Sequence, residues 1–453
     1  MLDFIKKYQS SIGYSLLLIV AIAIFVFRIV YRYVGFNTLY DEAFFLFRLQ
    51  EASLGIIDGS TIWNFIAIHL FPYLNLYNKV DAYLANILLH VASVVIITIA
   101  TCYKKNVETW LKYLALYSAV YTLSMYYNQE LTYVSFMVFF LTIIVSLCMI
   151  LRKCKTKIWI ALCCAGIGFV VPWAVLCTLP SGALTLLCIF ILLLSYYWGE
   201  WDKFGISVAS GIGGIIFGLL YIHCFVINLF DMLGAMRQVA DTITTTKRGY
   251  DPLSFFKQVL VVGKNWLLTL GGCGIVYSVT SLTSKFNRKW LTIFGESVYI
   301  IAMLLFYNYH PHIKTTEALL FSTITIFPLL LTIRTLRTAY DQYKWVDVMI
   351  WIFLLAFPLI ASIGTNIYLG KRMGCFMFSY VFLLSILPKN LVKINAGLLI
   401  AACFVVLAPS CKMMYETLSH KDAMVYYENN NSPISNILLE PSQADYFTTI
   451  IHI

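Results

Sequence analysis

Apolar runs long enough to cross a lipid bilayer recur along almost the whole chain, and they constrain its fold more than any other feature. Runs of about 20 apolar residues match the length that an α-helix needs to span the hydrocarbon core. Hydrophobic residues make up 60% of the 453 residues, and only 12% are charged. An ordinary soluble protein carries about 25% charged residues. The sequence therefore predicts an all-α, polytopic membrane protein.

Hydropathy predicts about 13 transmembrane helices. The predicted starts lie near residues 12, 82, 110, 131, 158, 181, 204, 265, 291, 319, 346, 375 and 394. These spans define one domain, residues 1–411, and the more polar residues 412–453 form a tail. The first run follows Lys6 and Lys7 and lacks a small-residue cleavage site, so we expect an uncleaved helix and not a signal peptide.

Clusters of Lys and Arg separate the apolar runs and predict how the chain crosses the membrane. The formal charge of +10 is also compatible with nucleic-acid binding, but short basic loops are explained more simply by the positive-inside rule. More than half of the basic residues then lie on the cytoplasmic side with the N-terminus. The tail and the larger loops, including residues 35–81, lie on the opposite face. In a bacterial inner membrane that face is periplasmic, and we expect the functional site there.

Two adjacent carboxylates, Asp41 and Glu42, follow the first apolar run. Charge close to a bilayer is costly, so such a pair marks a candidate functional site. Asn37 or Thr38 suits an N-cap, and the two acids then fall in the first turn, where the helix dipole favours their ionised form. The apolar residues that follow predict a short helix on the membrane surface. The carboxylates can act as a base or bind a cation, and the alternative is a helix cap beside a solvated neighbour.

This part of the chain resembles the GT-C membrane glycosyltransferases, among them the protein O-mannosyltransferases and the bacterial aminoarabinose transferase. In that superfamily an acidic pair follows the first helix on the outer face, and a segment with His or Pro comes before the second helix. The matching parts here are Asp41-Glu42 and His69-Leu70-Phe71-Pro72-Tyr73. Pro72 stands where the superfamily usually has two adjacent prolines.

The resemblance implies an enzyme of the cell envelope that moves a sugar from a polyprenyl-phosphate donor to an acceptor hydroxyl on a lipid, a glycan or a protein. It implies that Asp41 is the catalytic base and that His69 belongs to the substrate-binding site. Glu42 then supports Asp41 or helps it to hold a divalent cation such as Mg²⁺ or Mn²⁺. Membrane lipids are expected partners, and nucleic acid is not.

Other charged residues suit the same chemistry. An anionic phosphate leaving group needs a cation near the membrane surface, and Lys371 and Arg372 at the outer end of a predicted span are the first candidates. Snorkelling to lipid headgroups is the alternative for both. Arg248, in a long outer loop, is a second phosphate-binding candidate. Glu130 is the charged residue in a tight outer turn between two predicted spans. It is predicted to be a second catalytic carboxylate, or else a plain turn residue.

Two histidines and two arginines complete the candidates. His310 and His312 lie on either side of a proline, where hydrogen bonding to substrate or pyrophosphate fits better than zinc binding. An ordinary interfacial loop is the alternative. Arg28 and Arg32, near the end of the first run, are expected to pair with carboxylates or lipid phosphates, or to snorkel.

Two other functions are compatible with a protein of many spans. A polymerase or ligase of lipid-linked polysaccharide would depend on Arg residues in the long outer loop, residues 229–264, and would not need Asp41. A transporter or flippase would need intramembrane charges or broken helices near the midplane. The spans offer few such features apart from prolines such as Pro358 and Pro409. The acidic pair favours the sugar transferase.

Overall fold

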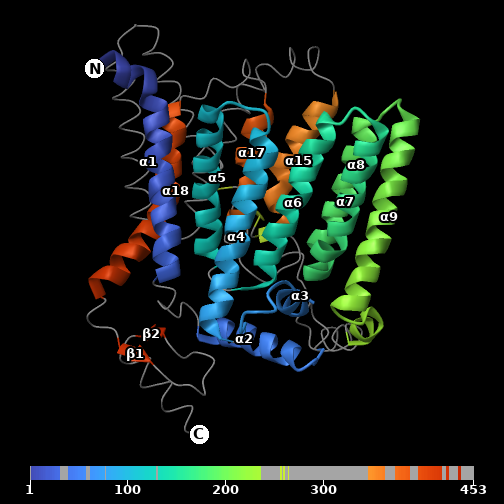
Figure 1. Ribbon diagram of the computed structural model, residues 1–453, viewed down its shortest axis with the longest axis horizontal. Coiled ribbons are helices and arrows are strands. Elements are labelled where there is room, and N and C mark those ends of the chain that lie inside the picture. The colour runs from blue at the N-terminus through green and yellow to red at the C-terminus, as the bar shows by residue number, and fades with distance from the viewer. Residues whose placement is uncertain are drawn as a thin grey trace.

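The protein is a bundle of long helices with two short helices lying across one end (Figure 1). The computed structural model describes residues 2–30, 39–57, 62–76, 78–128, 131–235, 345–362, 373–387, 396–420, 425–427 and 437–439, with isolated positions between 256 and 264. In chain order its elements are α1 (Leu2–Val30), α2 (Leu39–Ser53), α3 (Trp63–Leu70), α4 (Lys79–Cys102), α5 (Val107–Tyr127), α6 (Tyr133–Lys153), α7 (Lys157–Cys177), α8 (Leu179–Tyr196), α9 (Trp201–Phe225), α15 (Trp345–Ser362), α17 (Phe378–Ile386), α18 (Ala396–His420), β1 (Val425–Tyr427) and β2 (Ile437–Leu439).

Five of the described helices are long and apolar enough to cross a membrane, judged by length and composition. They are α1 over Ser10–Val30, α4, α6, α7 and α9. Shorter apolar stretches occur in α8 and α15, over Thr185–Leu194 and Asp347–Ala361. These helices indicate a membrane protein, as the composition predicts.

Helix α5 lies inside the bundle, in contact with α1, α4, α17 and α18. Tyr117 and Tyr121 are among the largest fully buried side chains, and the Tyr117 hydroxyl shares a 2.9 Å hydrogen bond with the Thr101 hydroxyl of α4. Tyr121 stacks on Phe378 of α17 with ring centroids 5.5 Å apart. These aromatic residues of α5 therefore serve helix packing. They join α5 to α4 and to α17, which comes much later in the chain.

Polar residues just before the helices explain where several of them begin. The Asn78 side chain accepts a hydrogen bond from the Val80 backbone N–H at 2.9 Å, and the Asn106 side chain accepts one from Thr109 at 3.0 Å. Thr132 and Ser135 form a reciprocal capping box at the start of α6. Each cap satisfies backbone donors that a helix start leaves without intrahelical partners.

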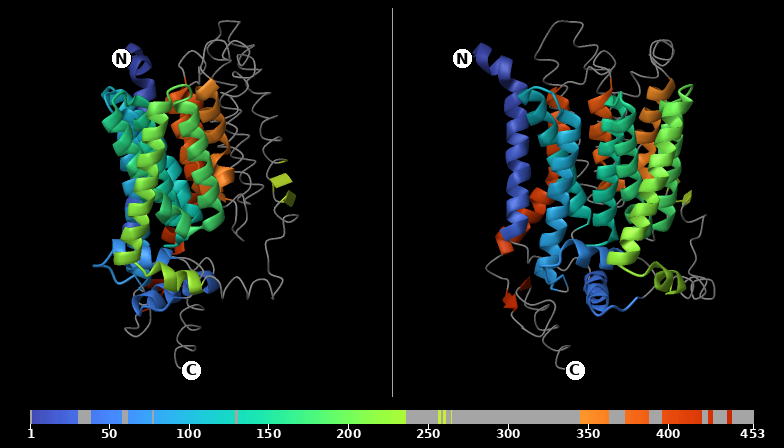
Figure 2. Two further views of the ribbon diagram at one scale, coloured as in Figure 1. Left: turned by 90° about the vertical axis from the view of Figure 1, so that its right-hand side faces the viewer. Right: turned by 45° about the vertical axis from the view of Figure 1, so that its right-hand side comes forward.

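The two ends of the bundle differ. The start of α1 lies at one end, together with the connections from α4 to α5 and from α6 to α7 (Figure 1). Helices α2 and α3 and the antiparallel pair β1–β2 lie at the opposite end, and the two further views agree (Figure 2). We call this second end the α2–α3 end. Its position, opposite the start of α1, is the one that the sequence predicts for the first long loop and the tail.

Most predicted spans correspond to observed helices. The helices α4 to α9, α15, α17 and α18 begin within about one turn of predicted starts. The all-α class is confirmed, apart from the short β1–β2 pair. The spans predicted near residues 265, 291 and 319 lie outside the described residues, so the total of about 13 stays a prediction. Helix α18 continues to His420, so the segment expected to be a tail from residue 412 starts inside this helix.

Candidate functional site

Asp41 and Glu42 lie in the first turn of α2, so the short helix predicted after the first span is confirmed. Their side chains are outside the described part of the structure. Their backbone positions are still informative, because residues four apart lie on the same side of a helix. Asp41 and Glu42 therefore precede Phe45 and Leu46 by one turn on the same side of α2.

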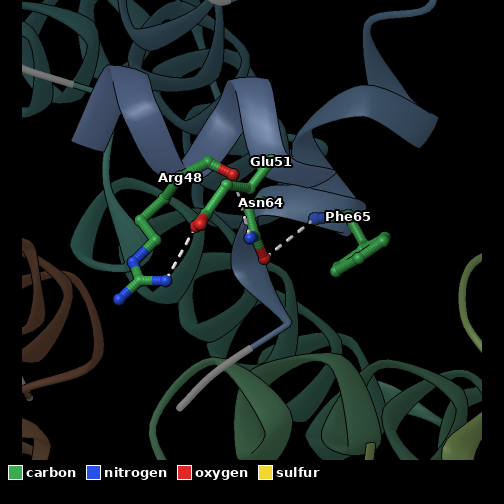
Figure 3. A network of polar contacts seen from close by, with 4 residues as sticks. All are labelled: Arg48, Glu51, Asn64 and Phe65. Atoms are coloured by element: carbon green, nitrogen blue, oxygen red, sulfur yellow. Dashed lines mark hydrogen bonds and ion pairs between the residues drawn. The ribbon is translucent and has the colours of Figure 1, made fainter. Parts of the chain in front are cut away.

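Helix α2 is held firmly against α3. The buried Asn64 side chain donates a hydrogen bond to the Arg48 carbonyl at 3.2 Å and accepts one from the Phe65 N–H at 3.1 Å (Figure 3). Arg48 and Glu51 form an ion pair at 2.7 Å along α2. The Phe45 ring packs edge-on against Trp63 with centroids 5.8 Å apart. These contacts fix the helix that carries the acidic pair.

A narrow pocket lies between α2 and α4, and the same side of α2 as the acidic pair forms one of its walls. Its lining residues are Phe45, Leu46, Leu49, Lys79, Ala82, Tyr83 and Leu131. Lys79 is buried, at 7% relative exposure. The pocket thus brings the buried Lys79 and the phenol of Tyr83 together with Phe45 and Leu46. These two residues lie one helical turn after the acidic pair on α2.

Arg28, near the end of α1, contacts the pocket residue Tyr83 and is 1% exposed. Its Nη1 donates to the Tyr83 hydroxyl at 3.2 Å and to the Met125 carbonyl at 3.1 Å. Its Nη2 faces the sulfur of Met413 at 4.0 Å, and its Nε has no hydrogen-bond partner. Among the described residues no carboxylate forms an ion pair with Arg28. The side chain is buried inside the bundle, so it does not snorkel to the membrane surface.

A buried polar network joins α4, α5 and α6 at the α2–α3 end. The Asn86 side chain donates to the Asn128 carbonyl at 2.9 Å. The Asn128 side chain donates to the Ser135 hydroxyl at 2.7 Å and accepts a bond from the Thr132 hydroxyl at 2.9 Å. The turn between α5 and α6 is thereby anchored on both sides of residues 129–130.

His90 extends this network towards the middle of the bundle. Its Nδ1 lies 2.8 Å from the Asn86 carbonyl, which can only accept, so Nδ1 carries the proton. Its Nε2 lies 3.1 Å from the Ser124 hydroxyl. In the neutral imidazole, Nε2 accepts the hydroxyl proton of Ser124. The ring is fully enclosed, at 1% exposure.

The predicted substrate-binding residue His69 lies at the C-terminal end of α3. Its Nε2 is 3.1 Å from the Tyr221 hydroxyl of α9, and its ring lies 6.3 Å from that of Trp173 in α7. The contacts described for His69 are with α7 and α9 and not with the pocket between α2 and α4. The structure thus places His69 at the α2–α3 end but on the side of the bundle formed by α7 and α9.

Several predicted site residues lie outside the described residues: Glu130, Arg248, His310, His312, Lys371 and Arg372. Two of their described neighbours are informative. Leu131, next to Glu130, lines the pocket between α2 and α4. Gly374, two residues after Arg372, approaches the ring of Tyr127 so closely that an added Cβ would lie 2.2 Å from a ring carbon. Leu131 lies in the turn after α5, and Gly374 packs against the last turn of α5.

No metal centre is evident among the described side chains, since no group of three His, Cys, Asp or Glu residues lies close enough together. The side chains of Asp41 and Glu42 are not in that set, and their role as ligands for Mg²⁺ or Mn²⁺ stays a prediction.

Sequence reasoning missed Lys79, Tyr83 and Asn128. A lysine and a tyrosine four residues apart at a helix start are ordinary features of an interfacial helix. Asn128 sits in a short turn, where asparagine is common. A signal for this site exists only in three dimensions, because its members come from α1, α2, α4 and the turn after α5.

Fold and site together define a helical membrane protein with a polar, partly cationic site at one end of its bundle. No protein-family model matches the chain, and a search of curated proteins finds no similar sequence. The proposed activity therefore depends on the residues themselves.

Proposed function

We propose that the protein is a membrane glycosyltransferase that moves a sugar from a polyprenyl-phosphate donor to an acceptor hydroxyl. The observation that supports this most is the position of the acidic pair in the first turn of α2. This helix lies across the α2–α3 end and borders a pocket with the buried cation Lys79. A base and a cation close to the membrane surface are the two groups that such a transfer needs.

The chemistry assigns one role to each group. Asp41 accepts the proton of the acceptor hydroxyl as that oxygen attacks the anomeric carbon of the sugar. The bond between the anomeric carbon and the phosphate oxygen breaks, and the polyprenyl phosphate leaves with the bonding electrons. Positive charge stabilises the leaving phosphate. Glu42 supports Asp41 or shares with it a divalent cation, which would neutralise charge on the phosphate.

The orientation follows from charge. Basic residues gather at the end opposite α2 and α3, in the connections that contain Lys104, Lys105, Arg152, Lys153 and Lys155. Cytoplasmic loops carry such an excess of Lys and Arg. We therefore propose a bacterial inner membrane location with the α2–α3 end on the periplasmic face.

The remaining predicted residues keep their proposed roles. Glu130 is a second carboxylate of the catalytic site. The proposed substrate-binding residues are His69, Arg248, His310, His312, Lys371 and Arg372.

The test is sugar transfer by the purified protein, assayed with a panel of polyprenyl-phosphate sugars. Asp41→Asn keeps the size of the side chain but removes the proton acceptor, so we expect transfer to fall by roughly 10² to 10⁴-fold with folding intact. Asp81→Asn is the matched control. Asp81 lies in the first turn of α4 at the same end and accepts a bond from the Asn75 N–H at 2.9 Å, which an amide oxygen can also accept.

We expect Asp81→Asn to transfer sugar at close to the wild-type rate. A well-folded Asp41→Asn variant with full activity would contradict the proposed mechanism. A loss of activity on changing Arg residues within 229–264, with Asp41→Asn active, would indicate a polymerase or ligase instead. Uptake or flipping of lipid-linked sugar without transfer would indicate a transporter.

A further inference from the structure

The guanidinium of Arg28 is a buried cation with one edge that lacks a strong hydrogen-bond acceptor. A guanidinium has five N–H donors. Two are used by the bonds of Nη1 to Tyr83 and Met125. The donors of Nε and Nη2 share one edge, where Nε has no partner and Nη2 has only the sulfur of Met413 at 4.0 Å, a weak acceptor.

This edge has the geometry that binds oxyanions. Two parallel N–H donors match two oxygens of a phosphate or a carboxylate, and such bidentate pairs are among the strongest charge-assisted hydrogen bonds. Within the described part of the chain no carboxylate forms an ion pair with Arg28. Burial of a charge without a counter-ion is costly, and intramembrane charges accordingly mark binding sites or ion pathways. Since the described residues supply no such counter-ion, an anion from outside the chain can take that role.

The surroundings of Arg28 are suited to receiving that anion. The Tyr83 oxygen accepts from Arg28, so its hydroxyl proton can be donated to another acceptor, and the same residue lines the pocket between α2 and α4. Lys79 lies one turn away on α4 and lines the pocket too. Lys79 and Tyr83 thus line the same pocket, and the Tyr83 hydroxyl links the α4 wall of that pocket to Arg28.

We propose that the Nε and Nη2 edge of Arg28 binds the phosphate of a lipid-linked phosphate, with the Tyr83 hydroxyl as a second donor once the anion is bound. Arg28 lies within the apolar span of α1, at Ser10–Val30, where an anion carried on a lipid has easier access than a free ion. The identification of that lipid as the polyprenyl carrier depends on the proposed function; the phosphate site does not.

The experiment measures binding of three phosphate probes to the full chain in phosphatidylcholine nanodiscs, without any sugar. The probes are a polyprenyl monophosphate, phosphatidic acid and inorganic phosphate. A ligand that binds the folded state raises the thermal unfolding midpoint, so the midpoint is followed during titration. For wild type we expect a rise with the polyprenyl monophosphate. Loss of charge-assisted bonds should make binding to Arg28→Met roughly 10- to 100-fold weaker.

Two further variants separate a binding role from a structural one. Arg28→Met removes a buried charge, so without ligand it should unfold at the wild-type temperature or above. If the main role of Arg28 were to stabilise the fold, the variant would unfold at a lower temperature. Arg152→Met is the control, because it makes the same change of charge at the opposite end, where Arg152 pairs with Asp347. Its ligand titration should match that of wild type.

If Arg28→Met fails to fold, Arg28→Lys and Tyr83→Phe give the answer. Arg28→Lys keeps the charge but not the two-donor edge, and Tyr83→Phe removes the second donor. Each variant should therefore bind the polyprenyl monophosphate roughly 3- to 10-fold more weakly than wild type. Equal binding by wild type and these variants would overturn the proposal. So would the absence of any midpoint shift in wild type with all three probes.

The three probes also identify the source of the phosphate. A shift that needs Arg28 with phosphatidic acid or inorganic phosphate, but not with the polyprenyl compound, supports the Arg28 site and contradicts the polyprenyl donor. Transfer that depends on Asp41 but not on Arg28 would support the enzyme and contradict the assignment of the Arg28 site to the phosphate of its donor. Failure of the two proposals is therefore distinguishable.

Discussion

Asn128 shows how much one polar side chain contributes at the end of a membrane helix. It is 8% exposed, and its amide group bonds to both Thr132 and Ser135, which cap the next helix. Buried hydrogen-bonding groups that lose a partner cost about 1 to 3 kcal/mol each. The side chain thus fixes the two described sides of the turn between α5 and α6.

We predict that Asn128→Ala lowers the unfolding free energy by about 2 kcal/mol, because the hydroxyls of Thr132 and Ser135 lose a partner. Asn106→Ala is the control on the same helix, since Asn106 caps the other end of α5 in an exposed turn. Its loss should cost about 1 kcal/mol. Unfolding titrations with SDS in mixed micelles measure both values. Equal losses would mean that burial adds nothing at Asn128.

At the scale of elements, α7 and α9 pack unusually closely. A Cβ atom added to Gly214 would lie 2.2 Å from the Ala165 carbonyl oxygen, and one added to Gly168 would lie 2.1 Å from that of Gly211. Small residues allow membrane helices to approach so that backbones touch. The closely packed pair presents Trp173 and Tyr221 to His69.

The close approach predicts that alanine substitutions at two neighbouring glycines change the stability of the protein differently. Gly214→Ala should destabilise the protein by about 1 to 3 kcal/mol, because the methyl group forces α7 and α9 apart. An atom added to Gly213 meets open space, so Gly213→Ala should be neutral or stabilise by up to about 1 kcal/mol through helix propensity. Thermal unfolding in detergent compares the two. A harmless Gly214→Ala would contradict the observed packing.

At the scale of the whole molecule, the candidate groups that the structure describes gather at one end and the basic connections at the other. Helix α2 carries the acidic pair, α1 and α4 carry Arg28 and Lys79, and all of them meet at the α2–α3 end. Orientation in the membrane therefore decides which compartment would supply the acceptor of the proposed transfer.

Orientation can be tested with an impermeant thiol reagent on intact cells. A cysteine introduced at Asp58, between α2 and α3, should be labelled, and one at Lys155, between α6 and α7, should react only after permeabilisation. The background should carry Ser in place of the exposed Cys224 and Cys411, and of Cys273, which lies outside the described residues. Labelling of Lys155→Cys alone would reverse the topology and place the acidic pair in the cytoplasm.

The sequence by itself determined the helical class, the approximate starts of the described spans and the helix that begins just before Asp41. These features depend on local apolar length and local capping, which hydropathy and residue type record directly. Tertiary structure alone decided that Arg28 is enclosed, that Tyr83 connects it to the pocket, and that His69 contacts α7 and α9. Such contacts depend on which faces of distant helices meet, and a lone Arg at a span end looks the same in sequence whether it snorkels or is buried.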